Sequence, residues 1–237
     1  MNSFKSFKNE LHPLLNTIVA SEEYHPKWLN TLSYLENCGA RKIAACEHPI
    51  MVDEEMLKHA SEEFRHAHYL KRQIRRLTSN SFPSYSLKSI LGGMTSWHYL
   101  RALDHFTSHY LKHVIGLSQA SLRELAYHLV TYVIELRAKE LYQIYDEVLR
   151  RNHSKVTVKS ILLEEEEHLA EMESYLAQTP SSSLYIKVII SFEATLFEKW
   201  LKDLHKDICH RADSSKSLAD SNIFPENVSS GKAIVPS

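Results

Sequence analysis

The stretch MLKHASEEFRHAHYLKRQIRRL, residues 56–77, gives the clearest indication of the fold of this chain. Its apolar residues recur every three to four positions, which is the period of an amphipathic helix. The apolar face is formed by Met56, Ala60, Ala67, Leu70, Ile74 and Leu77. Glu63 interrupts this face, and His66 follows it three residues later. Residues three apart on a helix project to the same side, so the pattern predicts a helix over about 52–78 that directs a carboxylate and an imidazole into the core.

A second Glu-x-x-His pair, Glu165 with His168, lies on the apolar face of a helix predicted over about 156–177. A third copy, Glu22 with His25, falls in a predicted break before Pro26, so the spacing alone is not specific. The position on an apolar face distinguishes the first two pairs from the third.

A single glutamate on another apolar face precedes each of the two pairs, Glu36 before the first and Glu135 before the second. At 1.5 Å per residue, Glu36 lies roughly 18 Å before the end of its helix and Glu63 roughly 18 Å after the start of the next. Glu135 matches the depth of the second pair acceptably, and Glu140 is a rival at about 15 Å from its helix end. A small residue three positions later, Gly39 in one case and Ala138 in the other, favours Glu36 and Glu135.

The order of the predicted helices indicates a single all-α domain over residues 1–211. The four long helices are expected at about 27–47, 52–78, 121–150 and 156–177. The second and third are separated by about 40 residues, with a helix near 95–114, which is enough chain to return along a bundle. Two antiparallel hairpins with such a crossover form the ferritin-like four-helix bundle. Further helices are expected at 3–20 and 183–210, and residues 212–237 are expected to be a disordered tail.

The composition of the 237 residues limits the classes of protein that fit. Five glycines and seven prolines favour long helices, and a net charge of −1 argues against a nucleic-acid coat protein. The three cysteines form no Cys-x-x-Cys pair, which excludes a zinc ribbon or rubredoxin-type site. No apolar run reaches membrane-spanning length, so we expect a cytoplasmic protein that does not enter a membrane.

Burying four carboxylates without compensation costs many kcal/mol, so the six inward residues need a positive charge between them. Two divalent metal ions would neutralise four carboxylates. Oxygen ligands with one imidazole per metal suit iron or manganese. The sequence therefore predicts a di-metal site, with these ligands: Glu36, Glu63, His66, Glu135, Glu165 and His168.

Over residues 27–177 the chain resembles the ferritin-like di-iron carboxylate proteins, through the six ligands above. The resemblance implies that Glu63 and Glu165 bridge two irons and that the other four are terminal ligands. The string IELRAKELY, residues 134–142, is similar to a helix of the tRNA isopentenyladenosine hydroxylase family. The spacings of 27 and 30 residues between each lone glutamate and its pair are similar to those of aldehyde-deformylating oxygenases.

Other residues are expected near this site. Those predicted to support the ligands from behind are Tyr132, Tyr142, His59 and His128. Glu193 and the rival Glu140 are the candidates for an additional carboxylate. Glu62 and Glu164 are expected on the solvent side or rim. A basic cluster that could hold an anion comprises Lys71, Arg72, Arg75 and Arg76. His98, His105, His109 and His113 form one face of the crossover helix, interpreted as a packed or interface face rather than a second metal site.

The expected function is that of an oxygenase or oxidase with two irons (Fe/Mn as a variant), using dioxygen on an organic substrate. Its partners would be a free or carrier-bound substrate and an external electron donor. RNA and a second copy of the chain are the other candidate partners. One alternative is a ferritin- or rubrerythrin-like iron oxidase or peroxide scavenger. Another is a metal-free helical interaction protein.

Overall fold

The structure, a computed structural model, describes residues 4–48 and 50–220. In this part of the chain every regular element is helical and no strand occurs, which confirms the all-α prediction. The helices are α1 (Lys8–Val19), α2 (Tyr24–Cys46), α3 (Glu54–Ile74), α4 (Gly93–Tyr110) with its π-helical continuation η1 (Leu111–Ile115), α5 (Gln119–Arg151), α6 (Lys159–Gln178) and α7 (Ser182–Asp220).

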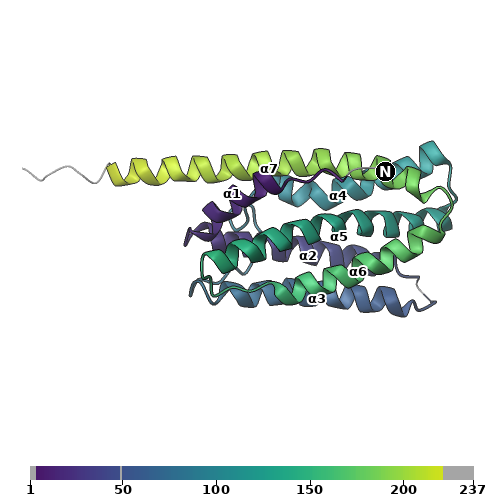
Figure 1. Cartoon of the computed structure of the whole chain (residues 1–237), viewed down its shortest axis with the longest axis horizontal. Coiled ribbons are helices and arrows are strands. Elements are labelled where there is room, and N and C mark those ends of the chain that lie inside the picture. Colours follow the sequence, from purple (N-terminus) through teal and green to yellow (C-terminus); the bar gives the residue numbers. More distant parts are fainter. Residues whose placement is uncertain (1–3, 49, 221–237) are drawn as a thin grey trace, which may run out of the picture.

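The helices lie roughly parallel to one long axis in three tiers (Figure 1). Helices α3 and α6 form one edge, α2 and α5 lie in the middle, and α7 runs along the opposite edge beside α1 and α4. Helix α2 packs most extensively on α3, and α5 packs on α6. The connection between these two hairpins contains α4, which packs on α7. None of the helices in the described part is both long and apolar enough to cross a membrane.

Local sequence explains where α3 begins and ends. The Asp53 side chain accepts a hydrogen bond from the Met56 amide at 3.1 Å, so it caps the helix N-terminus. Acidic residues follow in the first turn, and Lys71 and Arg72 lie in the last turn, where each charge opposes the helix dipole. Asp53 therefore fixes the start of α3, ten residues before Glu63.

Helix α2 starts at Tyr24, earlier than the sequence predicted. Pro26 lies in the first turn, where the missing amide hydrogen costs no helical bond. His25 is therefore not in a break: it is buried, and its Nε2 lies 2.8 Å from the Tyr145 hydroxyl.

Helix α7 also differs from the prediction, because it continues to Asp220 instead of ending near residue 210. No glycine or proline occurs between 209 and 220 to end it. Residues 212–220 of the predicted tail are thus helical, and residues 221–237 lie outside the described part.

An aromatic core joins the middle tier to α7 and α4. Trp28 of α2 stacks on Trp200 of α7 with ring centroids 5.7 Å apart, and Tyr99 of α4 stacks on the same indole. Gly92 permits this packing, because its φ is +75° and a Cβ there would lie 2.7 Å from Ser96 Oγ. This core is separate from the buried polar residues between the middle tier and α3/α6.

Candidate metal centre

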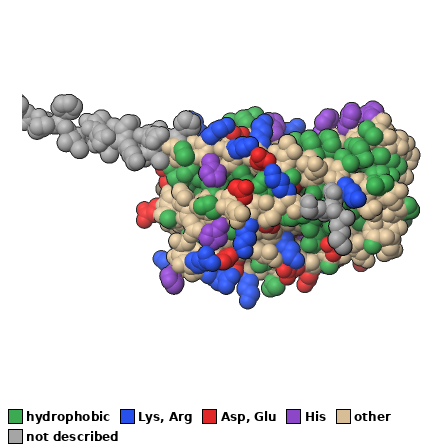
Figure 2. All heavy atoms as spheres, turned by 45° about the horizontal axis from the view of Figure 1, so that its top comes forward, with side chains coloured by type: hydrophobic (Ala, Val, Ile, Leu, Met, Phe, Trp, Pro, Cys, Tyr) green, Lys and Arg blue, Asp and Glu red, His purple; other side chains and the backbone are tan. Residues whose placement is uncertain are grey.

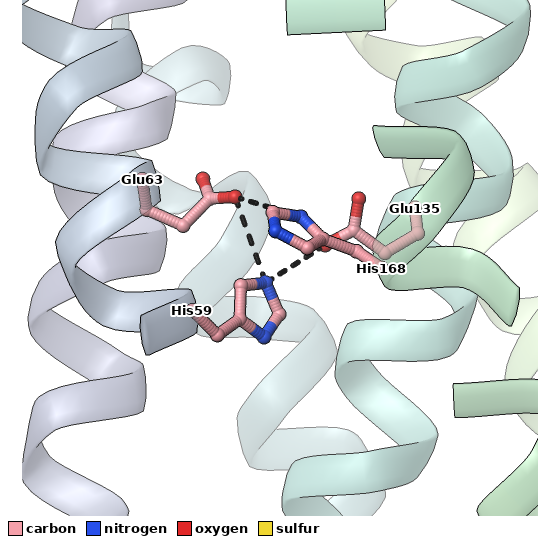
Figure 3. A group of neighbouring side chains, drawn as sticks. All are labelled: His59, Glu63, Glu135 and His168. Carbon is pink, nitrogen blue, oxygen red and sulfur yellow. Dashed lines mark ion pairs between the residues drawn. The ribbon is translucent and has the colours of Figure 1, made fainter. Parts of the chain in front are cut away.

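The structure brings all six residues of the predicted ligand set into one buried cluster, together with His59. Two overlapping groups in this cluster each have four ligand atoms within 4.8 Å of one another. The first group is Glu36, Glu63, His66 and Glu165. The second is His59, Glu63, Glu135 and His168 (Figure 3). Glu63 belongs to both groups and lies between them.

Four helices supply these side chains. Helix α3 contributes three of them, His59, Glu63 and His66, at a spacing of four and then three residues. This spacing keeps all three on one helical face. Helix α6 contributes Glu165 and His168 in the same way, while α2 and α5 each contribute one glutamate. His59 was expected to support the ligands from behind, but its Nε2 instead faces Glu135 at 3.3 Å.

Six inward-facing atoms of this cluster are buried and have no hydrogen-bond partner. Apart from the half-buried Glu36, each cluster residue is at most 5% exposed. The buried atoms without a hydrogen bond are His59 Nε2, Glu63 Oε1, His66 Nδ1, Glu135 Oε2, Glu165 Oε1 and His168 Nδ1. Buried polar atoms in folded proteins are almost always hydrogen-bonded. Six that converge on one volume therefore fit a bound ion, and these groups could hold a metal ion.

The charges around the cluster support this fit. No lysine or arginine in residues 4–48 and 50–220 forms an ion pair with any of its four carboxylates. Burial raises the pKa of Glu63 to about 7, and burial likewise raises the pKa of Glu135 to about 8. Burial would lower the pKa of His66, but the surrounding carboxylates raise it to about 11. Without a metal the cluster therefore retains protons, which metal binding would release.

Two further carboxylates hold the histidines from outside, and they do so across the two hairpins. His66 Nε2 of α3 lies 2.6 Å from Glu164 of α6, and His168 Nε2 of α6 lies 2.8 Å from Glu62 of α3. Arg65 donates two hydrogen bonds of 2.8 Å to Glu164. In both histidines the Nδ1 atom is left facing the cluster. A carboxylate on the outer imidazole nitrogen fixes the ring orientation of a metal-ligating histidine.

The expectation that Glu62 lies on the solvent side was therefore wrong, whereas Glu164 lies at the rim of the cluster, one of the two positions expected for it. Both are partly buried and contact a histidine of the cluster. The signal was present in the sequence, because each pair reads Glu-Glu-x-x-His, with Glu62 before Glu63 and Glu164 before Glu165.

The other residues expected to support the ligands have different positions. The Tyr142 hydroxyl donates to Glu36 Oε1, so this tyrosine supports the first group. His128 lies elsewhere, with its Nδ1 2.9 Å from the Glu124 carbonyl and its ring stacked on Tyr175. Tyr132 packs among apolar side chains of two smaller core clusters. Tyr127, which was not predicted, contacts His59 Nδ1 at 3.1 Å through its hydroxyl.

Neither of the two candidate additional carboxylates lies in the cluster. Glu193 is fully buried and accepts two hydrogen bonds of 2.9 Å from Arg137. Glu140 accepts from Arg137 and from the Phe7 amide. Glu193 was considered because it lies among apolar residues on its helix, but its partner is an arginine of another helix.

The basic cluster and the histidine face also lie outside the candidate metal centre. Lys71 donates to Asn30 and to the Phe82 carbonyl, so its ammonium is used within the fold, whereas Arg72 and Arg75 are exposed. The four histidines of the crossover segment are exposed and belong to neither metal-capable group of the described chain. Figure 2 shows histidine side chains on the surface at the upper right of the molecule, the end where α4 passes into η1 in Figure 1.

A small apolar chamber adjoins the metal centre. Its volume is about 60 Å³, and Glu63 and Glu135 form part of its wall. Ile43, Leu100 and Val130 supply apolar surface from three different helices. Gly39 also lines the chamber, and a Cβ there would lie 3.5 Å from Glu63 Oε2, an ordinary contact. Comparison of this chain with protein-family models, curated proteins and solved structures finds no match. The capacity of the cluster to hold a metal ion is therefore inferred from its residues and their geometry alone.

Proposed function

We propose that the chain is an oxidoreductase that holds two metal ions, iron in both positions or iron with manganese, and uses dioxygen on an organic substrate. One ion would bind to the first group and the other to the second, with Glu63 common to both. In this proposal α2, α3, α5 and α6 form a ferritin-like bundle around the metals. The organic substrate would be free or bound to a carrier, and an external donor would supply the electrons.

The observation that carries the proposal is the set of six buried atoms without hydrogen bonds, which converge from three helices. Carboxylate and imidazole ligands in this ratio suit iron and manganese better than copper or a thiolate-bound zinc. Four carboxylates also balance the charge of two divalent ions.

The surrounding residues have defined roles in this proposal. Glu164 orients His66, and Glu62 orients His168. Tyr142 orients Glu36 by a hydrogen bond. The apolar chamber beside Glu63 and Glu135 can hold the reacting part of a substrate away from water. Two bound iron ions would supply the redox chemistry that activates dioxygen. In an oxygenation, one oxygen atom enters a C–H bond and the other leaves as water, using two electrons and two protons from the donor.

Metal analysis of the purified protein tests the first part of the proposal. We expect near two metal ions per chain after anaerobic loading with Fe(II), and loss of both in Glu63→Ala because Glu63 belongs to both groups. Glu55→Ala is the matched control, since Glu55 is an exposed glutamate of the same helix. No bound metal in the wild-type protein, or an unchanged content in Glu63→Ala, would overturn the ligand assignment. The first result would support a metal-free interaction protein.

Oxygen consumption tests the second part. The loaded, reduced protein should consume dioxygen, and consumption should rise when a suitable organic compound is present. Rapid turnover of peroxide with no response to organic compounds would instead support an iron oxidase or peroxide scavenger.

A further inference from the structure

A wide surface cleft lies directly outside the apolar chamber. Its volume is about 740 Å³, within the range of small-molecule binding sites. Helices α2, α4 and α5 form its walls. The cleft and the chamber share four lining residues, which are Lys42, Cys46, Asp104 and Tyr127. The two spaces are therefore neighbours, with the ion pair between Lys42 and Asp104 at their boundary.

The charge of this cleft is strongly positive. Arg41, Arg101 and Arg123 line it, one from each of the three helices. All three are exposed, and none forms an ion pair with a carboxylate within the described part of the chain. Among the described residues that line the cleft, Asp104 is the only acidic one, and Lys42 already pairs with it. The arginines thus leave their charge uncompensated by the fold.

Convergence from three helices distinguishes these arginines from an ordinary solvated helix face. Tyr34 and Cys38 line the same cleft as Arg41 and Arg101. Burial raises the pKa of both Tyr34 and Cys38, and the two arginines oppose this rise. Arg123 likewise opposes the rise in pKa that burial causes for Cys46, one of the four residues shared with the chamber. A guanidinium binds carboxylate or phosphate through two parallel hydrogen bonds, and a charged cleft concentrates such anions.

We infer that the substrate of the proposed oxidoreductase is an amphipathic organic anion. Its carboxylate or phosphate group binds among Arg41, Arg101 and Arg123, and its apolar part passes Lys42 and Asp104 into the chamber beside Glu63 and Glu135. This inference rests on the proposed function only in that the bound anion is called a substrate. Binding of the anion can be measured without turnover. The small chamber accepts only a few heavy atoms, so most of the molecule stays in the cleft.

Calorimetric titration tests the inference with octanoate, octyl phosphate and neutral 1-octanol, on Mn(II)-loaded and on metal-free protein. We expect the two anions to bind at least tenfold more tightly than the alcohol. The preference should disappear in Arg41→Gln/Arg101→Gln/Arg123→Gln. It should persist in the matched control Arg72→Gln/Arg75→Gln/Arg76→Gln, which neutralises three exposed arginines at the end of α3.

A second variant separates the chamber from the charged cleft. Val130→Phe fills the chamber and should weaken the binding of octanoate and of octyl phosphate. The binding of inorganic phosphate should stay unchanged. If that variant is poorly folded, protection of Cys46 from alkylation by octanoate in a Cys38→Ser/Cys209→Ser background reports the same occupancy, since Cys46 lines both spaces.

Several results would overturn the inference. They are equal binding of octanol and octanoate, equal binding of octyl phosphate and inorganic phosphate, and binding of single-stranded RNA with no binding of the alkyl anions. Metal content distinguishes the two proposals. A metal-loaded protein that binds none of the anions refutes the cleft assignment alone, and an anion-binding protein without metal refutes the proposed function alone.

Discussion

Two buried charge clusters occupy opposite sides of α5, and they solve the problem of buried charge differently. On the side of α4 and α7, Arg137 donates two hydrogen bonds of 2.9 Å to Glu193 and one to Glu140, and Tyr99 donates to Glu193. Phe197 packs its ring 4.3 Å from the same guanidinium. This arginine cluster contains its own cation, and none of its side-chain atoms is left without a partner within the described residues.

On the side of α3 and α6, the cluster of candidate metal ligands, or metal cluster, contains four carboxylates, and no arginine or lysine of the described chain pairs with them. Glu135, only two positions before Arg137, belongs to this side. The comparison shows that this fold can neutralise buried glutamates with its own side chains where no ligand is required. Where it does not, the buried carboxylates either keep their protons, as the raised pKa values of Glu63 and Glu135 indicate, or bind a cation from solution.

Removing the cation of the arginine cluster should have the largest effect. Arg137→Met leaves Glu193 buried without its partner, which should lower the free energy of unfolding by about 3–5 kcal/mol. Urea denaturation measures the change. The double variant Arg137→Met/Glu193→Leu should recover most of the loss, and metal content should stay at the wild-type value in both. Loss of metal in the double variant would show that the two clusters are not independent.

When no metal is bound, the metal cluster should make the free energy of unfolding fall as pH rises. A carboxylate paired with an arginine has the opposite effect, because its contribution is lost as pH falls. Burial raises the pKa of Glu63 from its ordinary value to about 7, so its protonated form is favoured in the folded state. This stabilisation is complete below the unfolded-state pKa and is lost as pH rises through the folded-state value. The free energy of unfolding of the metal-free protein should therefore fall by on the order of 3 kcal/mol between pH 5 and pH 8. Urea denaturation at the two pH values checks this.

Glu63→Gln tests the origin of that pH dependence, because glutamine cannot ionise. The variant should be more stable than the metal-free wild type at pH 8, and its free energy of unfolding should depend much less on pH. Glu55→Gln should leave the stability at pH 8 and its pH dependence unchanged. A Glu63→Gln protein that is less stable than wild type at pH 8 without metal would contradict this account of the cluster.

Adding metal should stabilise the wild-type protein in the same buffer. At a free metal concentration one hundred times the dissociation constant, the gain is about 2.7 kcal/mol for each ion bound, equivalent to roughly 5–10 °C in Tm per site. Thermal denaturation with Mn(II) or anaerobic Fe(II) measures it. The shift should be absent in Glu63→Ala and complete in Arg137→Met, which separates the two clusters.

The smallest effect is expected from the outer carboxylates. Glu62→Gln and Glu164→Gln should each weaken metal binding tenfold to hundredfold, because the charged partner of one histidine is lost while every ligand atom remains. Competitive titration against a metal chelator measures the affinity. Glu166→Gln, an exposed neighbour on α6, is the control and should bind metal like the wild type.

Much of this arrangement could be predicted because helical periodicity is a local property. The Glu-x-x-His pairs lie on apolar faces, so the sequence alone could predict that Glu63, His66, Glu165 and His168 point inward, as they do. The matched depth of Glu36 was equally accessible, since it depends only on rise per residue. His59 lies on the same face as Glu63 and could have been placed in the cluster by the same argument.

Partners on other helices could not be predicted in this way. Glu140 rivalled Glu135 on depth, and only the packing of α5 shows that Glu140 faces Arg137 and the N-terminal segment. Glu193 has apolar neighbours in sequence, as a ligand would, but its environment is decided by α4 and α5. The arginines of the cleft likewise come from three helices, and no local pattern brings them together.

The crossed contacts of Glu62 and Glu164 have a consequence for how the molecule opens. Each hairpin holds a histidine of the other, so separating α3 from α6 removes the support of both imidazoles in one step. Transient opening and release of metal should thus be one event. Metal binding should then slow amide hydrogen exchange across α3 and α6 by a common factor, whereas exchange in α7, which holds none of these residues, should be little changed.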